Sequence, residues 1–375
     1  MKDNRREFIK KGGALAALSI AGLNSCTTTA EPEKREVSFI KDPATRTPKE
    51  PYIKIALQAK PEPTEDDIKF IQQMGLNQVV LWTDAPKAGF EYYNSRRELY
   101  AANGINVFGF GNWDVHNQDK ITLGLPGRDE KIEEYLTHIR NLGKAGIHYT
   151  TYAHMANGIW STATETTRGG AVARAFDLTK ADKGYWHGVT YEAPLTHGRK
   201  YSADEIWSNY EYFIKKAVAV AEEQKVRIGI HPDDPPVEEL GGIPRCVFGS
   251  FEGYKRALEI ADSPYVGMCL CVGCWLEGGT MMGKDVIETI RYFGAQKKIF
   301  KVHFRNVNQP MPHFTETFLD DGYADMYQIL KALKEVDFDG VIIADHIPSM
   351  VYPQVGTAFS VGYMKGLVER VIAEG

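Results

Sequence analysis

Four side chains that can bind a divalent metal each come directly after a short apolar run in the C-terminal half of the sequence. They are His231, Cys271, His303 and Asp345. Imidazole, thiolate and carboxylate groups are the usual protein ligands of Zn2+, Fe2+ and Mn2+. One histidine or acid after an apolar run is common and usually structural. Four such residues after four successive runs predict a metal site.

Two further groups beside these candidates could hold an anion or move a proton. Arg305 lies two residues beyond the histidine of "VHFRNV", and its guanidinium suits a carboxylate bound through two hydrogen bonds. His346 directly follows Asp345, and an imidazole can titrate near neutral pH, so His346 is a candidate general acid or base. The alternatives are a salt bridge at the rim for Arg305 and a supporting or exposed position for His346. Asp233 and Asp234 either orient the preceding histidine or build a turn between prolines.

The clustered cysteines allow a second interpretation. Cys271 and Cys274 have the Cys-x-x-Cys spacing of a redox pair. A zinc ribbon would need a second close pair, and Cys246 stands alone. Five cysteines in 375 residues are too few for a disulfide scaffold. The metal-ligand and redox interpretations of Cys271 therefore both stay open.

The elements that must position these residues alternate along the chain after residue 50. Apolar, strand-like runs are predicted at 53–58, 78–82, 106–110, 147–152, 226–230, 265–270, 299–302 and 340–344. Helix-compatible segments follow them, among them 64–75, 94–103, 128–146 and 202–224. Eight β-then-α units predict an α/β fold closed as a (β/α)8 TIM barrel, which gathers the strand ends at one face. A phosphate-binding glycine motif after the first strand is absent from the sequence, which counts against a dinucleotide-binding fold.

Composition excludes some partners. The formal net charge is −5 and no basic stripe is present, so nucleic acid is not an expected partner. The sequence predicts no particular oligomeric state.

The first 50 residues are typical of an exported protein. Residues 1–26 contain Arg5 and Arg6 before a short Ala/Leu/Gly run, as in a twin-arginine export signal. "LNSC" resembles a lipobox, which would make Cys26 a lipidation site; a generic basic segment with a chance cysteine is the alternative. Residues 27–50, which are rich in Thr, Glu, Lys and Pro, are predicted to form a flexible tether. We therefore expect a periplasmic or membrane-anchored lipoprotein whose membrane contact is the lipid alone, with 51–375 as a single catalytic domain.

Several short motifs resemble the mannonate dehydratase family of the xylose-isomerase-like barrel superfamily. They are "ITLGLPGRDEKIEEYLTHIRNLGKAGI", "GIHPDDPP" followed by "GGIPR", "LCVG", "VHFRNV", "ADMYQILKAL" and "ADH". The resemblance implies a TIM barrel, Mn2+ as the metal (with Fe2+ or Zn2+ as alternatives), and loss of water from D-mannonate to give 2-keto-3-deoxygluconate. It also implies the same four metal ligands, with His346 and Tyr352 as catalytic groups and Tyr363 as the second choice for the tyrosine.

The chain departs from the family pattern around the substrate. The family's Phe-His-Glu motif appears as "FTE" at 314–316, the insert at 155–177 keeps its pattern only loosely, and an export signal precedes the domain. We therefore expect the same reaction on a different sugar acid, a uronate or a uronate-ended oligosaccharide. Arg305 is expected to anchor the carboxylate, with Asn306, Arg168 and Arg174 as further substrate contacts. The alternatives are a metal-dependent sugar isomerase or epimerase of the same superfamily and a non-catalytic sugar-binding lipoprotein.

Overall fold

The computed structural model describes residues 53–374, which belong to one compact unit. The predicted export signal at 1–26, the lipidation of Cys26 and the tether at 27–50 lie outside the described residues. Within the described part, none of the helices has the length and apolar character that crossing a membrane requires.

Parallel strands form the centre of the unit. One sheet has the order β1-β19-β16-β15-β12-β5, and a second has the order β2-β3-β4. Their bounds are β1 Lys54–Ile55, β2 Leu57–Gln58, β3 Gln78–Thr83, β4 Asn106–Asn112, β5 Tyr149–Tyr152, β12 Arg227–Ile230, β15 Val266–Cys271, β16 Ile299–Phe304 and β19 Val341–Ala344. Only Ala56 separates β1 from β2, so one extended run takes part in both sheets. The predicted α/β class and its parallel strands are confirmed.

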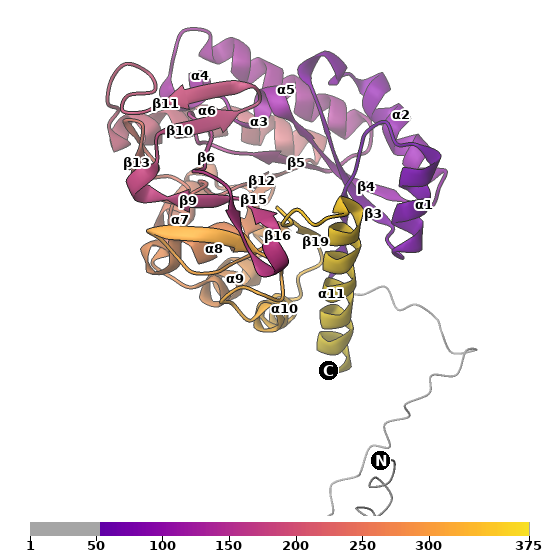
Figure 1. Ribbon diagram of the computed structural model, residues 1–375. Coiled ribbons are helices and arrows are strands. Elements are labelled where there is room, and N and C mark those ends of the chain that lie inside the picture. Colours follow the sequence, from indigo (N-terminus) through magenta and orange to yellow (C-terminus); the bar gives the residue numbers. More distant parts are fainter. Residues whose placement is uncertain (1–52, 375) are drawn as a thin grey trace, which may run out of the picture. The chain divides into compact units, whose positions relative to one another are not determined.

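Helices follow the strands and lie around them (Figure 1). The long ones are α1 Glu65–Gln73, α2 Phe90–Ala101, α5 Arg128–Lys144, α6 Ala203–Gln224, α7 Phe251–Ala261, α9 Val286–Ala295, α10 Met326–Glu335 and α11 Pro353–Ala373. The short ones are α3 Trp113–His116, α4 Asp119–Leu123, α8 Val272–Gly278, η2 Ala85–Lys87, η3 Arg168–Gly170, η4 Leu178–Lys180 and η5 Gly279–Met282. The helix predicted at 64–75 is present as α1, and Thr64 and Asp67 form a reciprocal capping box at its start.

Both faces of the parallel strands are buried. Successive residues such as Ile342 and Ile343 alternate between two hydrophobic clusters, a large one that includes many helix residues and a small one. The small cluster contains Ala56, Val80, Val341 and Ile343, with Phe108 packed against it. This burial explains why the strands read as continuous apolar runs in the sequence.

The long segment after β5 forms small antiparallel sheets rather than irregular coil. It contains β6 Ile159–Trp160, β7 Glu165–Thr166, β8 Val172–Ala173, β9 Ala175–Asp177, β10 Lys183–Trp186 and β11 Val189–Glu192. The remaining strands are β13 Glu239–Leu240, β14 Ile243–Pro244, β17 Asn306–Val307 and β18 His313–Thr317. Because β9 pairs with β18, the insert is tied to the segment that follows β16.

Candidate metal centre and active site

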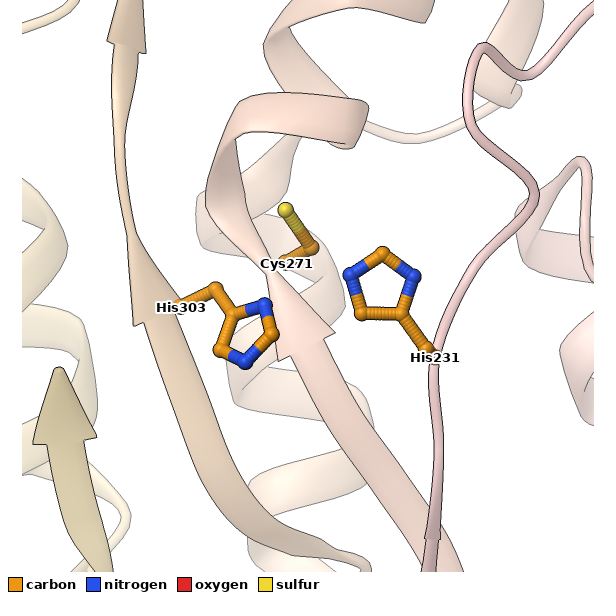
Figure 2. A group of neighbouring side chains, drawn as sticks. All are labelled: His231, Cys271 and His303. Carbon is orange, nitrogen blue, oxygen red and sulfur yellow. The ribbon is translucent and has the colours of Figure 1, made fainter. Parts of the chain in front are cut away.

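Three of the predicted ligands converge where neighbouring parallel strands end. One ligand atom each of His231, Cys271 and His303 lies within 4.8 Å of the other two (Figure 2). Cys271 and His303 are register partners on β15 and β16, and His231 directly follows β12. Asp345 directly follows β19, and its Oδ2 lies 3.6 Å from His303 Nδ1 and 4.0 Å from Cys271 Sγ. The structure therefore brings together all four residues predicted as ligands.

The two histidines present lone pairs to this centre in different ways. His231 Nδ1 lies 2.8 Å from the carbonyl oxygen of Pro232, so Nδ1 carries the proton and Nε2 is free to bind a metal. His303 Nδ1 is buried and has no hydrogen-bond partner among the described residues. Figure 2 shows a nitrogen of each ring pointing toward Cys271. A buried, unsatisfied nitrogen at this place fits a metal ligand.

The surroundings of Cys271 favour the thiolate, which is the metal-binding form. Burial raises the pKa of its thiol, but the hydrogen bond with Cys274 and the charge of Arg305 outweigh burial and lower the pKa well below its usual value. The Cys274 amide and Arg305 Nη2 donate to the sulfur at 3.5 Å and 3.4 Å. Cys271 and Cys274 are both free thiols. Two nitrogens, one sulfur and one carboxylate form a donor set suited to a divalent metal.

A buried charge network lies beside these ligands. Arg305 has no exposed surface; its Nη1 donates to Glu316 at 2.6 Å and its Nη2 to Glu277 at 2.8 Å. Arg174 donates to the same two carboxylates and to Asp234. Burial raises the pKa of Glu277 to about 8, although the two arginines oppose that shift. A second group of possible metal ligands lies in this network, because one ligand atom each of Asp234, Cys274 and Glu277 lies within 4.8 Å of the other two. The guanidinium groups of Arg174 and Arg305 already supply positive charge there.

The residues predicted to contact substrate all have protein partners. Arg305 and Arg174 belong to the buried network. Arg168 is partly exposed and binds Asp320 through two hydrogen bonds of 2.8 Å and 3.0 Å. The Asn306 amide donates to the carbonyl oxygens of Leu319 and Ala324. These partners favour supporting roles, and substrate contact by these four residues stays a prediction.

The predicted acid–base groups lie in the loop after β19. His346 Nδ1 is 2.8 Å from Glu316 Oε1, and about a third of its side chain is exposed (36%). Burial lowers the pKa of His346, but the carboxylates of Asp345 and Glu316 outweigh it and raise the pKa to about 9. Tyr352, directly before α11, is 71% exposed, whereas Tyr363 packs against the core within α11. Their catalytic roles stay predictions.

Besides two carboxylates of the charge network, three further buried residues near the centre were not predicted. Cys269 Sγ lies 3.6 Å from His303 Nε2, and Lys301 is the register partner of Cys269. Burial raises the pKa of Cys269, but the charges of His303 and Lys301 lower it to about 6. Both residues stand two positions before a ligand, so the strand period of two could have identified them. His116, buried at the end of α3, lies against aromatic rings, and no pattern in the sequence distinguished it.

Known proteins resemble this chain along most of its length. The family model described as D-mannonate dehydratase (UxuA) matches residues 68–190 and 189–373. Mannonate dehydratase of Streptococcus equi subsp. zooepidemicus is 33% identical over 270 residues, which are 67% of this chain and 72% of the relative. Mannonate dehydratase of Streptococcus pneumoniae is 30% identical over 269 residues, with the same two shares.

One solved structure supports the same assignment, and a more distant one matches in fold. The crystal structure of mannonate dehydratase from Streptococcus suis serotype 2 matches with a TM-score of 0.73 and 26% identity, covering 86% of this chain and 95% of that one. A xylose isomerase domain protein from Planctomyces limnophilus matches with a TM-score of 0.57 and 13% identity, covering 86% and 99%, which shows the fold alone. The chain belongs to the mannonate dehydratase family and is a hydro-lyase that removes water from a sugar acid.

Proposed function

We propose that the reaction takes place at the centre formed by His231, Cys271, His303 and Asp345 and gives a 2-keto-3-deoxy product. The convergence of these ligand atoms at neighbouring strand ends carries the proposal. Mn2+ is the proposed metal, with Fe2+ and Zn2+ as alternatives, because a carboxylate in a site that must also accept substrate suits Mn2+. A bound metal would act as a Lewis acid on the substrate carboxylate or a neighbouring hydroxyl.

Side chains of the protein would carry out the two proton transfers of the reaction. Dehydration removes a weakly acidic proton next to the carboxylate and expels a hydroxyl group, so it needs one base and one acid. His346 and Tyr352 are the proposed pair. Glu316 Oε1 lies 2.8 Å from His346 Nδ1, and Arg305 Nη1 lies 2.6 Å from each of these two atoms. Arg305 thereby supports both the acid–base histidine and the Cys271 sulfur.

The proposed substrate is a uronate or a uronate-ended saccharide met outside the cytoplasm. The N-terminal sequence supports export by the twin-arginine route, and the altered "FTE" stretch and insert support a substrate other than free mannonate. In this proposal Arg168 and Asn306 lie at the edge of the substrate site, and Cys26 carries the lipid.

We also propose that the two parallel sheets close into one eight-stranded barrel. The run from β1 to β2 joins them on one side. On the other side, the segment after β4 meets the residue after β5. The amide of Ala153 donates to the carbonyl of His116 at 2.8 Å, and Asn117 and Ala153 form an isolated parallel β-bridge. Closure would complete the ring of strand ends around the centre.

Metal content tests the centre. We expect the purified protein to contain a divalent metal, and Cys271→Ala and His303→Ala to lose metal and activity while keeping the circular dichroism spectrum of the folded protein. Cys246→Ala, which changes a thiol outside the centre, is the matched control. A metal-free preparation with full activity would contradict the proposal.

The product tests the reaction and the acid–base group. Mass spectrometry of products from a panel of sugar acids and uronate oligosaccharides should show loss of one water. Products of unchanged mass would indicate an isomerase or epimerase instead. His346→Asn should retain metal and lose turnover, and unchanged turnover would remove His346 from the mechanism.

A further inference from the structure

The ring of His303 lies between two sulfurs. Cys269 and Cys271 are two residues apart on β15, so both side chains leave the same face of the strand. The Nδ1 side of His303 faces Cys271 and Asp345, whereas Nε2 lies 3.6 Å from Cys269 Sγ. Each ring nitrogen of this histidine therefore has a different neighbour.

A metal-binding histidine needs a partner for its second nitrogen. That partner fixes which nitrogen carries the proton and how the ring is turned, and it is usually a carboxylate, a backbone carbonyl or a water. His231 follows this rule through the carbonyl of Pro232. At His303 the atom in that position is a sulfur, which accepts hydrogen bonds at longer distances than oxygen.

The level of Cys269 is filled by protein. Tyr149 is wholly buried beside Cys269: burial first, and then the charge of Cys269 and a hydrogen bond with it, raise the pKa of the Tyr149 hydroxyl. Lys301 is also wholly buried there, with its Nζ 5.7 Å from the centre of the Tyr149 ring. Because these side chains occupy the space, a water molecule has little room to replace the sulfur.

Lys301 makes the sulfur a better acceptor. Its Nζ has no hydrogen-bond partner among the described residues, although it is buried. Lys301 is the register partner of Cys269, which places a positive charge beside the sulfur. A cation at this place favours electron density on sulfur and therefore a hydrogen bond from the imidazole N–H.

We propose that Cys269 is a positioning residue whose sulfur holds the Nε2–H side of His303, so that Nδ1 is the nitrogen presented to the metal. This inference rests on the proposed metal centre. It predicts that the two histidine ligands bind through different nitrogens, His231 through Nε2 and His303 through Nδ1.

Metal affinity tests the role of the sulfur. We expect Cys269→Ala to weaken Zn2+ binding by about 10- to 100-fold in competition with a chelator, the usual effect of removing such a partner. Cys269→Ser keeps an acceptor and should recover part of that loss, whereas Cys246→Ala should bind as the unchanged protein does. Equal Zn2+ affinity of Cys269→Ala and the unchanged protein would overturn the inference.

A second experiment identifies the ring nitrogen of His303 that binds the metal. It uses the unchanged protein, so it tests the inference even if Cys269→Ala fails to fold. Long-range proton–nitrogen NMR of the nitrogen-labelled, Zn2+-loaded protein should show one histidine bound through Nδ1, and its signals should be absent from His303→Gln. If His303 binds the metal through Nε2, this inference is wrong but the proposed metal centre still stands. If the unchanged protein binds no metal, the proposed centre fails together with it.

Discussion

At this site one carboxylate interacts with several charged groups at the same time. Glu316 contacts both His346 and Arg305, so the proposed acid–base histidine and the arginine beside the proposed metal ligands depend on the same oxygen. Arg305 in turn donates to the Cys271 sulfur. A substitution at any one of these residues will therefore change the charge balance of the others, and single substitutions should not be additive.

Lys301 offers a test at the residue scale. A buried ammonium without a hydrogen-bond partner is costly, and an apolar side chain of similar length removes that cost. We expect Lys301→Met to raise the free energy of unfolding of the metal-free protein by about 1–3 kcal/mol and to weaken Zn2+ binding. Urea unfolding and chelator competition measure the two effects. Lys215→Met, on the exposed surface of α6, should change neither; a less stable Lys301→Met protein would show that the ammonium stabilises the fold.

At the scale of elements, ion pairs of one side chain in the insert after β5 connect the insert to the rest of the domain. Arg174, between β8 and β9, reaches Asp234, Glu277 and Glu316, and its side chain is only 13% exposed. The pairing of β9 with β18 adds backbone hydrogen bonds to the same connection. The insert is therefore held to the metal-centre region by charge as well as by β-pairing.

Removing the guanidinium of Arg174 should release the insert. Loss of one partner from a buried ion pair leaves the other charges uncompensated and typically costs about 3–5 kcal/mol. Arg174→Met should therefore unfold at lower urea and be cut faster by protease within 155–200. Arg168→Met breaks an exposed pair and should cost no more than about 1 kcal/mol. Equal protease sensitivity of the two variants would contradict this role for Arg174.

The capping box of α1 makes stability depend on pH. Hydrogen bonds from Thr64 and from Lys60 lower the pKa of Asp67 from 3.8 to about 2. A carboxylate whose pKa is lower in the folded state stabilises the fold above pH 3.8 and loses that effect as pH falls toward 2. Asp67→Asn should cost about 0.3–1 kcal/mol at neutral pH, and its stability should approach that of the parent near pH 2. A difference that persists at pH 2 would mean that the charge is not responsible.

For the whole molecule, buried neutral histidines should govern the first stage of acid unfolding. His138 lies between the Tyr93 hydroxyl at 2.7 Å and the Thr150 hydroxyl at 2.8 Å, and His154 lies 2.8 Å from the Tyr152 hydroxyl. Burial lowers the pKa of both histidines from 6.5 to about 3. Neither ring can therefore take up a proton in the folded protein until the pH falls far below neutral.

The unfolded chain binds these two protons near pH 6.5, so stability should fall as pH falls from about 6 to 4.5. Each histidine contributes about 1.4 kcal/mol per pH unit. Replacing His138 by Asn should lower stability at pH 7 and reduce the slope of unfolding free energy against pH by about 1.4 kcal/mol per unit. Denaturant unfolding at several pH values measures both, and an unchanged slope would show that other groups cause the acid sensitivity.

Much of the fold and of the metal centre follows from local patterns. Residues on both buried faces of the parallel strands are mostly apolar, so strands such as β15 and β16 are visible as runs, and the polar residue at the end of each run marks the end of the strand where sites form. That is why His231, Cys271, His303 and Asp345 could be predicted together. The same strand period would have identified Cys269 and Lys301 at the level below.

The charge network could not be predicted because its partners are distant in the sequence. Arg174 lies 60 residues from Asp234, 103 from Glu277 and 142 from Glu316. Only the path of the insert decides which carboxylates its guanidinium meets, and this path depends on the pairing of β9 with β18. The sequence by itself determined the parallel α/β class and the four residues of the proposed metal centre, because buried strands appear as apolar runs and each of these residues directly follows one. Only the tertiary structure decided which charges neutralise one another and which nitrogen of His303 faces Cys271 and Asp345, because both depend on contacts between distant segments.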